Sequence, residues 1–194
     1  MTRKKETLSA EYFDALYASD PDPWKFASSA YERDKYAKTL AALPEPHYAS
    51  ALEVGCSIGV LTRELASRCD ALLAVDAAEK PLIEARRGCA DLHHVRFEQM
   101  RVPEQWPSGE FDLILLSEVV YYLSADDVDR LASRVANAMA RRADVTLVHW
   151  TGETDYPLTG DEAADLCIKV MGPTMFVDRH DRYPNFRLDV LRRR

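Results

Sequence analysis

The sequence has few cysteines, and their positions fit neither a metal centre nor a disulfide framework. Its 194 residues include four cysteines, none of which forms a C-x-x-C pair or stands in a cluster with histidines. Paired cysteines at short spacings are the usual sign of a zinc site, and even sets in short secreted chains mark disulfide scaffolds. The sequence therefore predicts reduced thiols, no metal site and a cytoplasmic protein.

Long hydrophobic runs and an excess of basic charge are also missing. The most apolar stretch, residues 111–123, is interrupted by Asp112, Ser117 and Glu118 and is shorter than the ~18 residues of a membrane span. The charged N-terminus lacks the apolar region of a signal peptide. A net charge of −7 argues against a general nucleic-acid binder, which normally carries a basic face. We expect neither a membrane nor a nucleic acid as partner.

The length and composition fit one folded unit. A chain of 194 residues can bury roughly 70% of its unfolded surface. Apolar residues make up 47% of the chain and charged residues 29%, as is ordinary for a globular protein. No internal repeat and no low-complexity linker divides it.

A turn marked by glycines follows the first apolar strand pattern. Residues 51–62 predict a short strand, a turn and the start of an amphipathic helix. Gly55 and Gly59 have no Cβ, so the backbone there can approach a ligand closely. Residues 71–76 predict a second buried strand ending in Asp76, about 20 residues after Gly55. At this spacing a nucleotide-binding unit places an acid beside the ribose hydroxyls.

Two glycines of the dinucleotide pattern are absent from this turn. The pattern G-x-G-x-x-G needs a middle glycine to admit the pyrophosphate and a last one to pack helix on strand. Those positions hold Ser57 and Val60, which argues against NAD or FAD. A ligand without a pyrophosphate needs less clearance, and S-adenosylmethionine is the obvious candidate.

The same turn resembles the first motif, E-x-G-x-G-x-G, of class I S-adenosylmethionine-dependent methyltransferases. Glu53, Gly55 and Gly59 match the motif, whereas Ser57 replaces its middle glycine. Asp76 at the end of the next strand strengthens the match. The resemblance implies S-adenosylmethionine as cofactor and methyl transfer as activity.

Strand patterns alternate with helical patterns of 10–15 residues along the chain, which predicts βαβ units and a parallel sheet. The resemblance implies a Rossmann-like class I methyltransferase fold: a seven-stranded, mostly parallel sheet with helices on both faces. Residues 1–46 would form an N-terminal helical cap over the site, and residues 47–194 the methyltransferase domain. We expect strands at 51–54, 71–76, 95–98, 110–117, 144–150, 175–179 and 186–191, and helices at 8–17, 29–43, 61–69, 79–88, 124–141 and 161–170.

Longer blocks resemble the nodulation protein S family of methyltransferases. The D-P-W block at 22–24, residues 29–36 and the S-E-V-x-Y-Y-L block at 117–123 carry the match, which runs from about Asp20 to Trp150. That family N-methylates the deacetylated glucosamine end of a chitooligosaccharide. The resemblance therefore implies a small-molecule acceptor with an amine, an aminosugar or oligosaccharide. The sequence predicts no oligomeric state.

The candidate cofactor residues gather where strands end, because ligands of open α/β sheets bind outside the carboxyl ends of the strands. Asp76 would bind the ribose diol, and the backbone carbonyl of Ser117 the methionine ammonium. The family usually places groups around the adenine at the positions of Gln99 and Met100. The full set is Trp24, Tyr31, Glu53, Gly55, Cys56, Ser57, Gly59, Asp76, Ala77, Gln99, Met100, Ser117, Glu118 and Tyr121.

Several of these residues have a structural alternative. The two glycines could be ordinary turn residues, Asp76 could cap the next helix, and Met100 could pack in the core. Glu53 could contact the cofactor through water or orient the loop. Glu32 fits a capping box with Ser29, and a contact with the methionine end is an additional possibility.

Three residues are candidates for catalysis. Glu118 could accept a proton from the nucleophile or neutralise charge near the sulfonium, or it could form a salt bridge on a loop. His149 ends the fifth strand and could act as a base or be structural. Tyr122 could line the acceptor channel, since aromatic faces attract cations, or pack a helix.

Three other functions compete with N-methylation. An O-methyltransferase of a small polar metabolite would share every cofactor feature. A non-catalytic module would bind S-adenosylmethionine and turn nothing over. A nicotinamide oxidoreductase is disfavoured by Ser57 and Val60.

Overall fold

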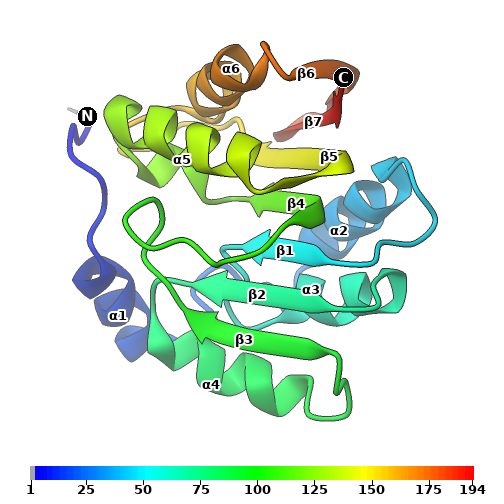
Figure 1. The fold of residues 1–194 in the computed structure, drawn as a ribbon. Helices are drawn as coiled ribbons and strands as arrows, with labels where there is room; N and C mark the ends of the chain where they lie inside the picture. The colour runs from blue at the N-terminus through cyan, green and yellow to red at the C-terminus, as the bar shows by residue number, and fades with distance from the viewer. Residues whose placement is uncertain (1–2) are drawn as a thin grey trace.

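A seven-stranded sheet forms the centre of the computed structural model, which describes residues 3–194 (Figure 1). The strand order is β3-β2-β1-β4-β5-β7-β6. β7 runs antiparallel to both neighbours, and the other neighbouring pairs are parallel. The strands are β1 (Ala51–Val54), β2 (Leu72–Asp76), β3 (Val95–Gln99), β4 (Phe111–Ser117), β5 (Met139–Trp150), β6 (Met175–Arg182) and β7 (Phe186–Arg193).

The predicted seven-stranded, mostly parallel sheet is confirmed. In its closing hairpin the antiparallel strand β7 lies between β5 and the edge strand β6 (Figure 1). The order reverses between β1 and β4, the kind of switch point at which α/β proteins bind ligands.

Helices cover both faces of the sheet. On one face α5 and α6 pack against the side chains of Leu52, Val75 and Leu147. On the other face α2 and α3 pack against Leu72 and Leu113, and these alternating positions follow from the period of two in a strand. The helices are α1 (Ala10–Ser19), α2 (Ala30–Ala42), α3 (Val60–Leu65), α4 (Glu79–Gly88), α5 (Ala125–Asn137) and α6 (Gly160–Met171).

Most predicted elements are confirmed, and α4 matches its predicted bounds. α5 ends at Asn137 rather than near Arg141, because the chain enters β5 at Met139 through a register irregularity. α3 ends at Leu65 and a single 3₁₀ turn replaces its last part. Residues 100–110 cross from β3 to β4 as a loop (Figure 1).

The capping box predicted at Ser29 is half formed. The Ser29 hydroxyl accepts a hydrogen bond from the Glu32 backbone N–H at 3.4 Å. The Glu32 carboxylate does not return to Ser29, because it pairs with Lys35 one turn along α2. A complete box is present instead at the start of α6, between Thr159 and Glu162.

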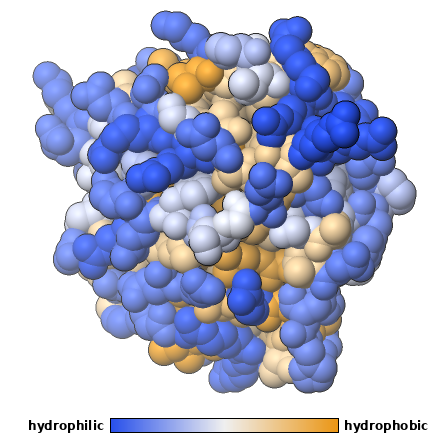
Figure 2. Space-filling view, in the orientation of Figure 1, coloured by the Kyte–Doolittle hydropathy of each residue, from blue (hydrophilic) through white to orange (hydrophobic). Residues whose placement is uncertain are grey.

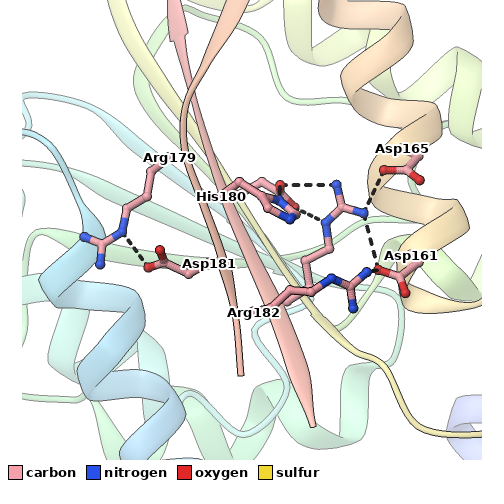
Figure 3. Close-up of polar contacts among 8 residues, drawn as sticks. Asp161, Asp165, Arg179, His180, Asp181 and Arg182 are labelled. Atoms are coloured by element: carbon pink, nitrogen blue, oxygen red, sulfur yellow. Dashed lines mark hydrogen bonds and ion pairs between the residues drawn. The ribbon is translucent and has the colours of Figure 1, made fainter. Parts of the chain in front are cut away.

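A cluster of charged side chains ties the closing hairpin to α6 (Figure 3). We call Asp161, Asp165, His180, Arg187 and Asp189 the hairpin cluster. Arg187 and Asp189 alternate on β7, and the Arg187 Nε lies 2.7 Å from the Asp189 carboxylate. Asp165 of α6 lies 2.7 Å from the same guanidinium, and His180 Nδ1 of β6 lies 2.6 Å from Asp189.

The surface in the view of Figure 1 is mostly hydrophilic, with an apolar area near its middle, below α5 (Figure 2). Within residues 3–194 no helix has the length and apolar character to cross a membrane. The same residues contain no group of three or more His, Cys, Asp or Glu placed to hold a metal ion. All four cysteines are buried thiols.

Candidate functional site

A cavity of about 330 Å³ opens at the carboxyl ends of β1, β2 and β4. This is within the range of small-molecule pockets, and it lies at the switch point of the sheet. Apolar side chains of α1 and the loop after β3 form part of its wall, among them Phe13 and Met100. Two acids, Glu53 and Asp76, line it as well.

The turn after β1 shapes the floor of this cavity. Gly55 has φ +84°, a left-handed conformation that L side chains rarely adopt. A Cβ at this position would lie 3.1 Å from the Val119 Cβ and 3.3 Å from the Ser117 carbonyl oxygen. Ser57 also has a positive φ of 49°, and its hydroxyl lies 2.5 Å from the Tyr17 hydroxyl of α1. The turn therefore has two residues in left-handed conformations, and the contact with Tyr17 of α1 holds it in place.

Asp76 faces the cavity and also fixes the turn. Its carboxylate accepts hydrogen bonds from the backbone N–H of Ser57 at 2.9 Å and of Ala78 at 3.0 Å. Burial raises the pKa of Asp76, and these amides offset part of that rise. Each carboxylate oxygen has a second acceptor site, so Asp76 retains capacity for a diol.

Glu53 is the second acid of the cavity wall, and one of its carboxylate oxygens lacks a partner. It is 2% exposed, and among residues 3–194 no group hydrogen-bonds its Oε2. Burial raises the pKa of Glu53 to about 7. A buried polar atom without a partner is costly, so this oxygen fits a donor supplied by a ligand or water.

These groups fit S-adenosylmethionine chemically. A glycine turn allows close approach, Asp76 offers a carboxylate to a diol, and apolar walls suit an adenine. Glu53 and the Ser117 carbonyl provide acceptors for an ammonium group.

A second cavity of about 370 Å³ adjoins the first. The two cavities share four lining residues: Trp24, Phe26, Glu118 and Tyr122. The second cavity is rich in aromatic and acidic side chains, the others being Tyr31, Glu32, Tyr121, Trp150, Glu153 and Tyr156.

Glu118 stands where the two cavities meet. It follows β4 directly with φ +56°, a conformation uncommon for a non-glycine residue and typical of functional sites. Its carboxylate accepts hydrogen bonds from the Tyr121 hydroxyl at 2.5 Å and the Trp150 backbone N–H at 3.0 Å. The Lys35 ammonium lies 2.7 Å away. Burial raises the pKa of Glu118, but Lys35 and these donors outweigh it and hold the pKa below its usual range.

Lys35 links Glu118 to α2. Its side chain is 2% exposed, and its ammonium also lies 2.9 Å from the Glu32 carboxylate. Burial raises the pKa of Glu32, with Lys35 acting in the opposite direction. We call Glu32, Lys35 and Glu118 the junction cluster.

The structure brings together most of the residues singled out in the sequence. Tyr31 and Tyr121 line only the second cavity. The first cavity is lined by Trp24, Glu53, Gly55, Cys56, Ser57, Asp76, Ala77, Met100, Ser117, Glu118 and Tyr122.

Gly59 and Gln99 lie outside both cavities. Gly59 has φ +79°, and a Cβ there would lie 2.9 Å from the Ala85 Cβ, so its small size serves the packing of α3 on α4. Gln99 is exposed and donates a hydrogen bond to the Ala77 carbonyl at 2.9 Å. Neither residue therefore borders the space in which the cofactor was expected.

His149 also borders neither cavity. It is 0% exposed, and no group among residues 3–194 hydrogen-bonds either ring nitrogen. Burial lowers the pKa of His149 to about 4, so the ring is neutral at pH 7. Its position disagrees with the expectation of a base facing the cleft.

Several residues that line the cavities were not predicted from the sequence. Lys35 belongs to an E-x-x-K spacing on α2, a signal that places it on the same face as Glu32. Tyr17 and Tyr36 have the spacing of helix-packing aromatics, yet both line the first cavity. Tyr156 lies beyond the matched motifs, so no sequence signal points to it.

The nodulation protein S (NodS) family model matches residues 13–153. Nodulation protein S of Bradyrhizobium diazoefficiens is 33% identical over 129 residues, which cover 66% of this chain and 61% of that protein. Nodulation protein S of Rhizobium tropici is 34% identical over 120 residues, covering 61% of this chain and 49% of that protein. The chain thus matches about half to three fifths of the length of these curated relatives.

Solved structures share the fold. A protein from Pseudomonas syringae has 36% identity and a TM-score of 0.76, covering 85% of this chain and all of that one. The N-methyltransferase NodS from Bradyrhizobium japonicum, solved with S-adenosyl-L-homocysteine, has 18% identity and a TM-score of 0.80 over 95% of this chain and 97% of its own. At that identity the likeness shows the fold alone, and the fold is the Rossmann-like class I methyltransferase fold.

The family model covers well over half of the chain, including both glycines of the first turn, Asp76 and the loop after β4. On this match the chain belongs to the nodulation protein S (NodS) family.

Proposed function

We propose that this chain transfers a methyl group from S-adenosylmethionine to the amine of a small, sugar-like acceptor. The observation that carries this proposal is the pair of adjoining cavities with Glu118 in their shared wall. A donor in one cavity and an acceptor in the other would meet at that wall. Bringing two reactants together in line is the main task of such an enzyme.

The first cavity would hold the cofactor. Asp76 would bind the ribose hydroxyls, and Met100 would pack against the adenine. Gly55, Cys56, Ser57 and Ala77 would form the adjoining wall, and Glu53 and the Ser117 carbonyl would accept from the methionine ammonium. When bound, S-adenosylmethionine supplies an activated methyl group together with its own leaving group.

The second cavity would hold the acceptor. Glu32, Glu118 and Glu153 line it with Lys35, so ionised side chains give it a net negative charge. Tyr31, Tyr121 and Trp150 add aromatic faces, which attract cations. This lining supports an amine over a phenol or a carboxylate as the group bound there.

Glu118 would act through its charge. Its lowered pKa and three donors make it a weak proton acceptor and a stable carboxylate. It would orient the amine and compensate positive charge at the junction, while the amine proton leaves to water. His149 is too enclosed to take that proton.

The N-terminal segment, residues 1–46, would act as a cap over the site. Residues 1 and 2 lie outside the described part of the chain. Tyr17 of α1 lines the first cavity, and Lys35 of α2 lines the second. The Leu8 backbone N–H donates to the Tyr122 carbonyl at 2.9 Å, which ties the segment to the loop after β4.

Mass spectrometry of reactions with S-adenosylmethionine tests the proposal. We expect a gain of one methyl group on glucosamine and short glucosamine oligomers, and none on N-acetylglucosamine, whose nitrogen is acylated. Asp76→Ala should abolish turnover and weaken calorimetric binding of S-adenosylhomocysteine. Methylation of a hydroxyl acceptor alone would contradict the amine assignment, and binding without any turnover across the acceptor series would favour a non-catalytic module.

A further inference from the structure

The junction cluster is a buried charge arrangement that protein stability does not explain. Lys35 is 2% exposed and contacts both Glu32 and Glu118. Burying charges costs several kcal/mol per ion, and apolar residues of the same volume are often as stabilising. A buried charge cluster that faces cavities is a candidate for function on these grounds.

The geometry shows what the cluster does to Glu118. One oxygen, Oε1, takes the Lys35 ammonium at 2.7 Å, and the other takes the Tyr121 hydroxyl and the Trp150 backbone N–H. These three groups come from α2, the turn after β4, and β5. Only Lys35 among them brings a full charge.

From these contacts we propose that Lys35 is a positioning residue for methyl transfer, which acts by fixing the Glu118 carboxylate, ionised, at the junction of the two cavities. The inference deepens and rests on the proposed function. Lys35 reaches Glu118 from the N-terminal segment, so the site would be complete only with α2 docked on the sheet.

The charges around Glu118 make this role specific. The titratable groups that face it are Lys35, Glu32, Tyr31 and Tyr36 of α2, Tyr121 and Tyr122 of the following turn and His149 of β5. His149 is neutral at pH 7 and Tyr121 stays protonated, because burial lowers the pKa of the first and raises that of the second. Without Lys35, Glu118 and Glu32 would be two like charges with no cation between them, and they would share a proton.

The test compares Lys35→Met with a matched control, Lys38→Met. Lys38 lies one turn along the same helix and pairs with Asp34 on the surface. We expect Lys35→Met to lower kcat by at least about tenfold, since small losses of alignment are costly, with KM for S-adenosylmethionine within threefold of wild type. Lys38→Met should leave kcat within twofold.

A double-mutant cycle decides whether Lys35 acts through Glu118. If it does, Lys35→Met in a Glu118→Gln background should have no further effect on kcat, and the double variant should match the single one. If the two single losses in kcat multiply in the double variant, the proposal is overturned. A kcat of Lys35→Met within twofold of the Lys38→Met control would also overturn it. If Lys35→Met fails to fold, Lys35→Gln replaces it, because glutamine can still donate hydrogen bonds. The same outcomes are expected for Lys35→Gln.

A binding measurement separates this inference from the proposed function. The ratio of calorimetric affinities for S-adenosylmethionine and S-adenosylhomocysteine reports charge near the sulfonium without turnover. In wild type we expect the ratio to stay constant between pH 6 and 9. In Lys35→Met it should rise with pH by about tenfold as the shared proton leaves. A constant ratio in the variant would overturn the inference, whereas failure of both ligands to bind wild type would overturn the proposed function.

Discussion

The hairpin cluster and the junction cluster each hold a buried cation, and they differ in what surrounds it. Arg187 of the hairpin cluster is enclosed by β6, β7 and α6, and it lines neither cavity. Lys35 of the junction cluster reaches into the wall of the second cavity. Both cations contact carboxylates at 2.7 Å, so pair geometry alone does not distinguish them.

The neighbourhood of a buried charge therefore indicates its role. In the hairpin cluster, Arg187 joins strand and helix, and its carboxylate partners border neither cavity. In the junction cluster, the carboxylates face space that a donor and an acceptor can occupy. Substitutions in the first region should therefore change stability, and substitutions in the second should change binding and turnover.

The largest effect on stability is expected in the hairpin cluster. Arg187→Met leaves Asp189, which is 0% exposed, without its main cation. Breaking a buried ion pair in this way costs about 3–5 kcal/mol of unfolding free energy. Urea denaturation should show this loss, with S-adenosylhomocysteine affinity unchanged in the folded protein.

Arg179→Met is the control for this prediction. Arg179 pairs with Asp181 on the same edge strand, and its side chain is 44% exposed. Its loss should change the unfolding free energy by less than about 0.5 kcal/mol. Equal losses of unfolding free energy in the two variants would show that enclosure of Arg187 does not strengthen its ion pair.

The next largest effect is expected at Glu53, where a buried acid faces the first cavity. Its pKa is raised to about 7 in the folded state from an ordinary value of 4.5. The folded protein therefore holds more protons than the unfolded one between these values, and stability falls as pH rises from 4.5 to 7. Above pH 7, ionisation of the buried Glu53 lowers the unfolding free energy by about 3 kcal/mol.

Glu53→Gln should remove this cost. We expect the variant to be more stable than wild type at pH 8 by up to about 3 kcal/mol and nearly equal to it at pH 4.5. Urea titrations at both pH values measure the difference. A stability difference that does not change with pH would show that Glu53 is already paired and does not offer a free acceptor to a ligand.

A smaller effect separates the two glycines of the first turn. Gly59→Ala should cost about 2 kcal/mol of stability, because a left-handed alanine is strained and its Cβ would meet Ala85. Its affinity for S-adenosylhomocysteine should stay within threefold of wild type. Gly55→Ala should lose affinity as well, since its neighbours Val119 and Ser117 line the first cavity.

The sequence carries enough information to predict the sheet and most of the first cavity. Strand ends are local features, so the strand patterns alone assign Gly55, Asp76 and Ser117 to one edge of a parallel sheet. The bounds of β5 and the position of β7 do not follow from local patterns, because register and strand order depend on contacts between distant segments.

The site residues that were predicted wrongly or not at all differ from the prediction mainly in how their side chains are buried. His149 ends a strand at the cleft side, but only the packing around it shows that it faces protein. Gly59 has the position of a ligand-facing glycine in the sequence, yet its contact with Ala85 joins two helices that are separate in the chain. Lys35 is one of several lysines in the sequence, and only the fold places Glu118 beside it.

The central claim, that the first cavity binds the adenosyl group, is tested most directly by a crystal structure with S-adenosylhomocysteine. We expect the ribose hydroxyls within hydrogen-bonding distance of Asp76 and the sulfur facing Glu118. A ligand bound elsewhere, with the Asp76 carboxylate contacting only the backbone amides of Ser57 and Ala78, would contradict it.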